Sequence, residues 1–278
     1  MEQVNRIAEQ AEETRLLRDN MSRVKNIIMV MSGKGGVGKS TVAVNLALGL
    51  AKMGKSTGIL DIDIHGPNVP KMLGVDDQQL FSSDEKRIIP LESSPNLKVV
   101  SLALAGYEPE RPIIWRGPIK MNVIKQFLKD VEWGELDYLV IDTPPGTGDE
   151  PLSICQLLPD MAGTIIVTTP QEVANLDAMK SVSFARELKV PIIGIIENMS
   201  GFVCPNCGSV SDIFGKGGGK AIAERFKENF LGELPLDPRI MQGGDSGRGF
   251  ISDSEGPAGQ AMTAIIEKII AGIDTKSA

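Results

Sequence analysis

One short segment of this chain limits its fold more than any other, because a strand-like run leads through a glycine-rich loop into a helical pattern. The apolar run from Asn26 to Met31 predicts a buried strand, Gly33-x-x-x-x-Gly38-Lys39-Ser40 follows it, and a helical pattern runs from Val42 to Met53. Glycines allow successive backbone N–H groups to point at one anion, and the start of a helix adds a positive dipole end. The segment therefore predicts a phosphate-binding loop.

Two side chains of this loop have the chemistry for a nucleoside triphosphate. Lys39 is placed to reach the β and γ phosphates, and the Ser40 hydroxyl to ligate Mg²⁺. We expect the whole loop to contact the nucleotide. The predicted nucleotide-binding residues in it are Gly33, Lys34, Gly35, Gly36, Val37, Gly38, Lys39, Ser40 and Thr41.

Further apolar runs recur along the chain, with helical patterns between them. They lack polar alternation, which indicates strands covered on both faces, so we predict a doubly wound, mostly parallel α/β sheet with helices on both faces. Residues 1–24 are predicted to form an N-terminal amphipathic helix. Residues 25–278 are predicted to form one domain without a linker, with a Cys-x-x-Cys metal loop near residues 198–210. The predicted strands are 57–62, 138–141, 163–167, 191–196 and 230–234, with a small β-rich excursion over 79–104, and the predicted helices are 116–131, 149–158, 175–188, 218–227 and 257–271.

Composition excludes several classes of protein. A single histidine, His65, rules out a multi-histidine metal site, and three cysteines are too few for a disulfide scaffold. The formal net charge of -7 argues against a non-specific nucleic-acid binder, and no apolar run approaches the roughly 20 residues that a membrane-spanning helix needs. A charged N-terminus containing acids does not resemble a targeting peptide. We therefore expect a cytoplasmic protein with no nucleic-acid or membrane partner.

Acidic residues follow two of the predicted strands, where a doubly wound sheet presents groups to its ligand. Asp61 and Asp63 point to the same side of an extended segment, so one can face Mg²⁺ or an attacking water. The run Tyr138 to Ile141 ends in Asp142 and a Pro/Gly loop. This arrangement predicts that Asp142 holds Mg²⁺ and that Gly146 offers an N–H to the γ phosphate.

The cysteines fall into a pair and a single residue. Cys204-Pro205-Asn206-Cys207-Gly208 lies in a predicted loop and precedes a poor helix start, so a metal knuckle is favoured over a redox pair. Cys155 lies in a helical pattern and is predicted to be a buried apolar residue. Zinc ions and cubane clusters usually take four ligands, and one copy of the chain supplies only the two cysteines of the pair. Two copies related by a two-fold axis would supply all four.

The phosphate loop carries a second lysine, Lys34, directly after its first glycine. The resulting Lys-Gly-Gly-x-Gly-Lys-Ser pattern resembles the deviant Walker A ATPases, which include septum-positioning, DNA-partitioning, nitrogenase-reductase and iron–sulfur carrier proteins. The resemblance implies a P-loop NTPase fold and a dimer in which Lys34 reaches the partner's nucleotide. It also implies that Asp63 positions the attacking water, that residues 65–68 form a mobile switch, and that Asn198 lies by an adenine base.

Four motifs together narrow the resemblance to the Mrp-type cytosolic iron–sulfur cluster carriers. They are Gly33 to Ser40, Asp61 to Pro67, Asp142 to Asp149 and Glu197 to Cys207. The resemblance implies a homodimeric ATPase that binds Mg-ATP, holds a [4Fe–4S] cluster on Cys204 and Cys207 of both subunits, receives it from donor proteins and delivers it to apo-proteins. The separate N-terminal domain and the N-terminal four-cysteine cluster of other members are missing from this sequence.

Two alternatives remain open at this point. A positioning or partitioning ATPase that works on a membrane would need a C-terminal amphipathic helix with a basic face. The C-terminal stripe Met262, Ile265, Ile266, Ile269 and Ile270 has no basic cluster beside it, which favours a helix packed on the core. The other alternative is a nucleotide-sensing scaffold with structural zinc at Cys204 and Cys207.

Overall fold

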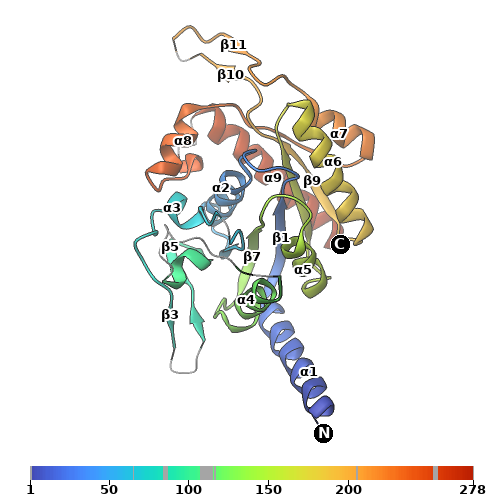
Figure 1. Cartoon of the computed structure of the whole chain (residues 1–278). Coiled ribbons are helices and arrows are strands. Elements are labelled where there is room, and N and C mark those ends of the chain that lie inside the picture. Colours follow the sequence, from blue (N-terminus) through green and yellow to red (C-terminus); the bar gives the residue numbers. More distant parts are fainter. Residues whose placement is uncertain are drawn as a thin grey trace.

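A computed structural model of the chain describes residues 2–64, 66–83, 87–106, 115, 117–204, 206–252 and 256–277. The switch residue His65 and the knuckle residue Pro205 therefore lie outside the described residues. A central sheet runs through the molecule with helices on both sides, and a thin two-stranded hairpin and the first helix extend from the body (Figure 1).

The central sheet has eight strands in the order β12-β9-β8-β1-β7-β2-β6-β5. Neighbouring strands pair in parallel, except that the edge strand β5 is antiparallel to β6. The sheet therefore confirms the mostly parallel, doubly wound fold. In chain order its strands are β1 (Val24–Met31), β2 (Thr57–Asp61), β5 (Leu91–Ser94), β6 (Leu97–Ser101), β7 (Leu136–Asp142), β8 (Gly163–Thr168), β9 (Ile192–Glu197) and β12 (Phe230–Glu233).

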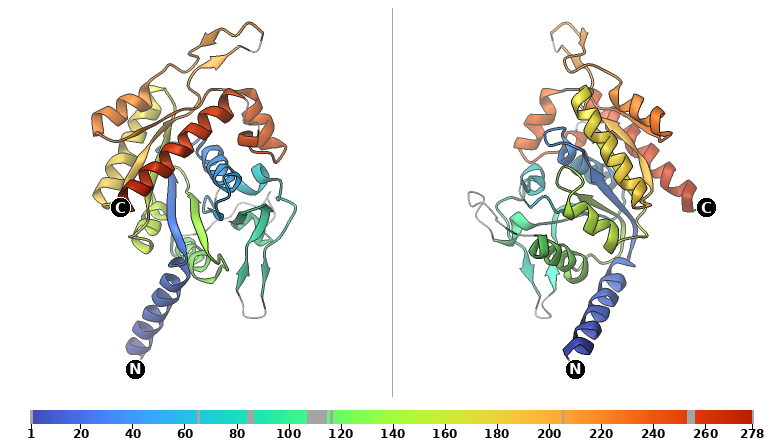
Figure 2. Two further views of the ribbon diagram at one scale, coloured as in Figure 1. Left: turned by 180° about the vertical axis from the view of Figure 1, so that it is seen from behind. Right: turned by 45° about the vertical axis from the view of Figure 1, so that its right-hand side comes forward.

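Apolar side chains project from both faces of this sheet and form two separate cores, one on each face. Along β1, Ile28 and Val30 enter one core, whereas Met29 and Met31 enter the other, because successive side chains of a strand alternate. Helices α2, α3 and α9 cover the first core, and α4, α5, α6 and α7 the second (Figure 2). The described helices are α1 (Glu2–Met21), α2 (Lys39–Lys52), α3 (Val69–Leu73), α4 (Gly117–Asp130), α5 (Asp149–Leu157), α6 (Glu172–Glu187), α7 (Gly218–Phe226), α8 (Pro238–Asp245) and α9 (Pro257–Ser277).

The first helix, α1, extends from the body of the protein (Figure 2). Its side chains from Ala8 to Leu16 are exposed, whereas Leu17, Asn20 and Met21 are buried against the second core. The Asn20 amide donates to the Leu128 and Val131 carbonyls at the end of α4. The buried last turn, together with an ion pair of 3.7 Å between Glu13 and Lys129 of α4, therefore anchors α1. The division of α1 from the domain that follows stays a prediction.

Several elements depart from the sequence-based expectations. The β-rich excursion over 79–104 is not separate, because β5 and β6 extend the central sheet and only β3 (Phe81–Ser82) and β4 (Ile88–Ile89) form a hairpin of their own. The cysteine pair lies in a second hairpin, between β10 (Phe202–Val203) and β11 (Val210–Ser211). Helices α3 and α8 were not predicted.

The C-terminal helix α9 packs on the core as its apolar stripe predicts. Met262, Ile265, Ile266 and Ile269 are all buried on the side of the sheet that α2 also covers, and Ile270 packs against the same core. None of the helices in the described part of the chain is long and apolar enough to cross a membrane.

Candidate nucleotide and metal sites

The predicted phosphate loop connects β1 to α2 at the carboxyl edge of the sheet. Gly36 and Gly38 adopt φ angles of 80° and 81°, which side chains rarely allow, and the Gly38 carbonyl accepts the Val42 N–H of α2. Gly33 lies directly against the backbone of Asp177 in α6, where a Cβ atom has no room. The glycines of the loop are thus required both by its conformation and by its packing.

Four of the predicted site residues, Lys39, Ser40, Asp63 and Asp142, meet behind this loop. The Lys39 Nζ lies 2.6 Å from Asp142 Oδ1 at the end of β7, 3.2 Å from the Ser40 Oγ and 3.9 Å from Asp63 Oδ2. Lys39 and Asp142 are 6% and 1% exposed, and Asp63 is 14% exposed. Strands β1, β2 and β7 are neighbours, so their carboxyl ends bring together groups from three distant parts of the chain.

A buried oxygen of Asp142 is suited to a divalent cation. Asp142 Oδ2 is buried and finds no hydrogen-bond partner among the residues that the structure describes. Lys39 Nζ contacts both the other Asp142 oxygen and the Ser40 hydroxyl, so the carboxylate and the hydroxyl lie close to each other. Oxygen ligands of this kind are the ones that Mg²⁺ prefers. The residues present therefore fit a magnesium ion that Asp142 and Ser40 would hold together with phosphate oxygens.

Asp61 has a different environment from Asp63. Its carboxylate is buried and accepts hydrogen bonds from the backbone N–H groups of Asp63 and Val69 and from the Ser101 hydroxyl. Burial, and then the neighbouring Asp142 carboxylate, raise the pKa of Asp61 well above its ordinary range. Asp61 thus holds the backbone at Asp63 and Val69 in place, whereas Asp63 is the less buried carboxylate and lies 3.9 Å from Lys39.

Lys34 and Gly146 differ in their surroundings. The Lys34 side chain is exposed. The Gly146 N–H donates to the Ser32 carbonyl at 2.7 Å, so it is engaged with the base of the loop in this conformation. Its predicted bond to a γ phosphate would require that contact to break.

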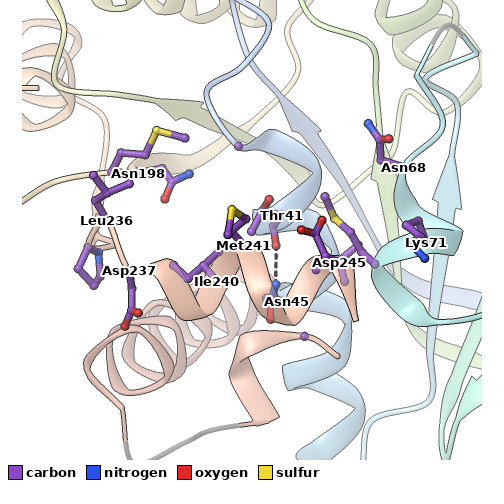
Figure 3. A pocket seen from close by; sticks show the side chains of 17 residues that line it. Thr41, Asn45, Asn68, Lys71, Asn198, Leu236, Asp237, Ile240, Met241 and Asp245 are labelled. Carbon is purple, nitrogen blue, oxygen red and sulfur yellow. Dashed lines mark hydrogen bonds between the residues drawn. The ribbon is translucent and has the colours of Figure 1, made fainter. Parts of the chain in front are cut away.

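A cavity of about 340 Å³ adjoins the loop at Gly38 and Thr41 (Figure 3). Its walls come from α2, α3, α8 and the segment before α8, and Asn198 lies at its border. The Asn198 amide donates to the Val37 carbonyl at 2.9 Å and is packed directly on Gly38. Asn45 lines the same cavity and donates to the Thr41 carbonyl, as the dashed line in Figure 3 marks. Asn198, the predicted base-side residue, is therefore in contact with the phosphate loop.

Sequence reasoning missed the wall of this cavity that α8 provides. The lining residues are Ile240, Met241 and Asp245 of α8, and Leu236 and Asp237 directly before it. A start signal for α8 was present, since Asp237 accepts the Arg239 N–H as a helix cap and Pro238 occupies the first position of the helix. Its eight residues contain Gly243 and Gly244, which weaken a helical pattern, and only two large apolar residues, Ile240 and Met241.

The cysteine hairpin stands away from the sheet, beyond the ends of α6 and α7 (Figure 1). The Cys204 N–H donates to the Ser209 carbonyl and the Gly208 N–H to the Cys204 carbonyl, each at 2.9 Å, which closes a tight turn around the pair. Cys204 is half-buried and Cys207 exposed, whereas Cys155 is buried in α5 as predicted. No cluster of three or more metal-ligating side chains occurs among the described residues, so the hairpin offers two thiols per chain.

The surroundings of Cys207 and of Cys155 shift the pKa values of the two thiols in opposite directions. Hydrogen bonding from the Ser209 hydroxyl, with smaller contributions from the Ser209 N–H and Cys204, lowers the pKa of Cys207. Burial raises the pKa of Cys155 to about 11. Since the thiolate is the metal ligand, Cys207 is prepared for a metal and Cys155 is not.

The parallel sheet, the phosphate loop with its two lysines, and the acidic residues at the strand ends define a P-loop NTPase of the deviant Walker A type. Residues 23–270 match the ParA-type family described as NUBPL iron-transfer P-loop NTPase. The chain belongs to this family.

Individual proteins with similar sequences or structures agree with this assignment. The chain is 50% identical over 266 residues, 96% of its length and 91% of the relative's, to the iron-sulfur cluster carrier protein of Methanocaldococcus jannaschii. It is 45% identical over 262 residues, 93% of its length and 88% of the relative's, to the cytosolic Fe-S cluster assembly factor CFD1 of Yarrowia lipolytica. A solved nucleotide-binding protein from Archaeoglobus fulgidus in complex with ADP superimposes with a TM-score of 0.76 at 37% identity, covering 88% of this chain and 94% of that one.

Proposed function

We propose that this chain is an ATP-hydrolysing iron–sulfur cluster carrier, which holds a [4Fe–4S] cluster between two copies of itself and transfers it to apo-proteins. One observation carries the proposal: a hairpin that carries one half-buried and one exposed cysteine belongs to the same chain as the nucleotide site of a P-loop NTPase. The names of the relatives from Methanocaldococcus jannaschii and Yarrowia lipolytica support it. The second name also supports a cytoplasmic location.

The cluster is cargo that needs ligands from two subunits. Cys204 and Cys207 supply two thiolates per chain, and a cubane cluster takes four. A two-fold axis through the cluster places the same hairpin of a second copy opposite the first. The homodimer is therefore part of the proposal, and the exposed position of Lys34 is compatible with a role across the same dimer.

The nucleotide site has the groups that ATP hydrolysis needs. Lys39 would exchange its contact with Asp142 for the β and γ phosphates, which frees the Asp142 carboxylate to hold Mg²⁺ together with Ser40. Asp63 orients the attacking water, and Lys34 of the partner stabilises the charge that develops on the γ phosphate. Bound Mg²⁺ neutralises phosphate charge. The cavity beside Gly38 and Asn198 takes the adenine base.

The decisive experiment is anaerobic reconstitution of the purified full chain with iron and sulfide, followed by an absorption spectrum and metal analysis. We expect a broad visible band and roughly two iron and two sulfide per chain, in a dimer. Cys207→Ser should lose the cluster, whereas Cys155→Ala, which removes the buried thiol, should keep it. Zinc without a visible band in the wild-type protein would contradict the proposal and favour a structural zinc scaffold.

A further inference from the structure

Two adjacent residues at the end of β9, Glu197 and Asn198, connect the cysteine hairpin to the phosphate loop. The Asn198 amide is bonded to the Val37 carbonyl of the loop, as described above. The Glu197 carboxylate belongs to neither site and is fully buried, with 0% exposure. A charged side chain in such a place needs hydrogen-bond donors around it, and their identity indicates what the residue does.

Among the described residues, the three hydrogen-bond donors to the Glu197 carboxylate lie at the two ends of the hairpin segment. Oε1 accepts the Ser200 hydroxyl at 2.7 Å and the Gly217 N–H at 2.9 Å, and Oε2 accepts the Gly219 N–H at 2.6 Å. Ser200 precedes the cysteines and Gly217 follows them. One carboxylate therefore ties the outgoing and the returning chain of the hairpin together at its base.

The run Gly217-Gly218-Gly219 is explained by this contact. Gly217 has a φ angle of 83° and caps α7, and a Cβ atom at Gly219 would lie 3.0 Å from the Glu197 Cβ. Gly218 lies against the Asn175 amide and the Pro170 carbonyl, where a side chain has no room. The glycines let the start of α7 approach the carboxylate, and the positive end of that helix stabilises the negative charge.

The outgoing chain of the hairpin is also bonded to the wall of the cavity beside the loop. The Ser200 N–H donates to the Leu234 carbonyl at 2.9 Å, and the Leu236 N–H donates to the Gly201 carbonyl at 2.8 Å. Leu236 lines the cavity. The base of the hairpin therefore contacts the nucleotide site at two places, the phosphate loop through Asn198 and the cavity wall through Leu236.

We propose that Glu197 is a positioning residue that makes the geometry of the Cys204 and Cys207 pair depend on the occupancy of the nucleotide site. A nucleotide that shifts Val37 or the cavity wall moves residues 197–201, and the carboxylate passes this movement to both chains of the hairpin. Buried charge-assisted hydrogen bonds are short and directional, so the connection is stiff. This inference rests on the proposed function, because it states how a bound nucleotide would control the cysteines that hold the iron–sulfur cluster.

The test measures the thiols directly in full-length protein without cluster. The rate at which iodoacetamide alkylates Cys207 is followed by peptide mass spectrometry, with and without saturating Mg-ADP and a non-hydrolysable ATP analogue. In the wild-type protein we expect at least one nucleotide to change this rate by about fivefold or more. The nucleotide-dependent ratio is the alkylation rate with nucleotide divided by the rate without it. Glu197→Gln presents an amide donor to one of the N–H groups, so in this variant we expect the ratio to lie within about twofold of one.

Separate measurements keep a positioning role distinct from a merely structural one. Loosening of the hairpin alone would raise the alkylation rate in both states and leave the nucleotide-dependent ratio unchanged. Ser200→Ala removes one donor to Glu197 and should reduce the ratio, Ser200→Thr keeps the hydroxyl and should restore it, and Ser211→Ala, an exposed serine on the same hairpin, should not alter it.

A wild-type ratio of one with both Mg-ADP and the ATP analogue overturns the inference. So does a Glu197→Gln protein that folds, binds nucleotide and keeps the wild-type ratio. If Glu197→Gln does not fold, an unchanged ratio in Ser200→Ala overturns it instead. Because the assay contains no cluster, these outcomes are independent of reconstitution. A chain that fails to take up a cluster but shows the ratio counts against the proposed function only.

Discussion

Lys39 and Asp142, 103 residues apart in the chain, form an ion pair of 2.6 Å that is almost completely excluded from solvent. The positive charge that is predicted to bind phosphate is thus neutralised by the carboxylate that is predicted to hold Mg²⁺. Neither charge is left uncompensated in the buried site, which would otherwise cost several kcal/mol.

Removal of Lys39 should therefore destabilise the nucleotide-free protein. We expect Lys39→Ala to lower the free energy of unfolding by about 3–5 kcal/mol, because Asp142 keeps a buried charge without its partner. Urea unfolding at pH 7.5 measures this. The control is Lys25→Ala, whose pair with Asp137 leaves the lysine 71% exposed and should cost less than about 1 kcal/mol. Equal costs for the two variants would contradict a buried, uncompensated carboxylate.

Lys34 is expected to act on the partner's nucleotide. Lys34→Ala should bind ATP with unchanged affinity and hydrolyse it about 10³-fold more slowly, the lower end of what an arginine finger contributes in trans. Lys220→Ala, at an exposed lysine of α7, is the control. Mixing Lys34→Ala with Asp63→Asn subunits should restore turnover, since one site of the mixed dimer then has both groups. Undiminished hydrolysis by Lys34→Ala would rule out this role.

Cys207 and Cys155 should differ in their rates of alkylation in protein without cluster. With a pKa of about 11, the Cys155 thiol is only about 0.1% thiolate at pH 8, whereas the pKa of Cys207 is lowered and its side chain exposed. Iodoacetamide at pH 8 should therefore modify Cys207 first and Cys155 only after unfolding in urea. Ser209→Ala should slow the modification of Cys207 near neutral pH, because it removes the main hydrogen bond that lowers its pKa. Early modification of Cys155 would show that α5 is not packed as described.

Asp61 should make the stability of the protein depend on pH. Its pKa is raised in the folded state by burial, so the folded state binds the proton more tightly than the unfolded state, whose pKa is about 3.9. The contribution of Asp61 is fully present below that value and is lost as the pH rises toward the folded-state pKa. Asp61→Asn cannot titrate, and its stability relative to wild type should increase between pH 5 and pH 8 in urea unfolding. A constant difference over this range would contradict the raised pKa.

The sequence was sufficient wherever a local pattern determines the structure. The apolar strands, the phosphate loop and the Asp142 strand end are continuous segments, and the parallel sheet then brings Lys39, Asp63 and Asp142 together. Glu197 could not be identified in this way, because its donors Ser200, Gly217 and Gly219 are joined to it only by the return of the hairpin. The two strands that flank the cysteines are too short for a periodic signal.

The hairpin that carries Cys207 at its exposed tip also has a chemical cost. Cys207 is exposed, so peroxide can reach its thiol as easily as the ligands of a recipient protein can. Its lowered pKa also increases the fraction of reactive thiolate. Oxidation of Cys207 to a sulfenic acid, followed by attack of the Cys204 thiolate with loss of hydroxide, would join the two ligands in a disulfide. The redox state of the surroundings would then determine how many copies are free to accept cargo.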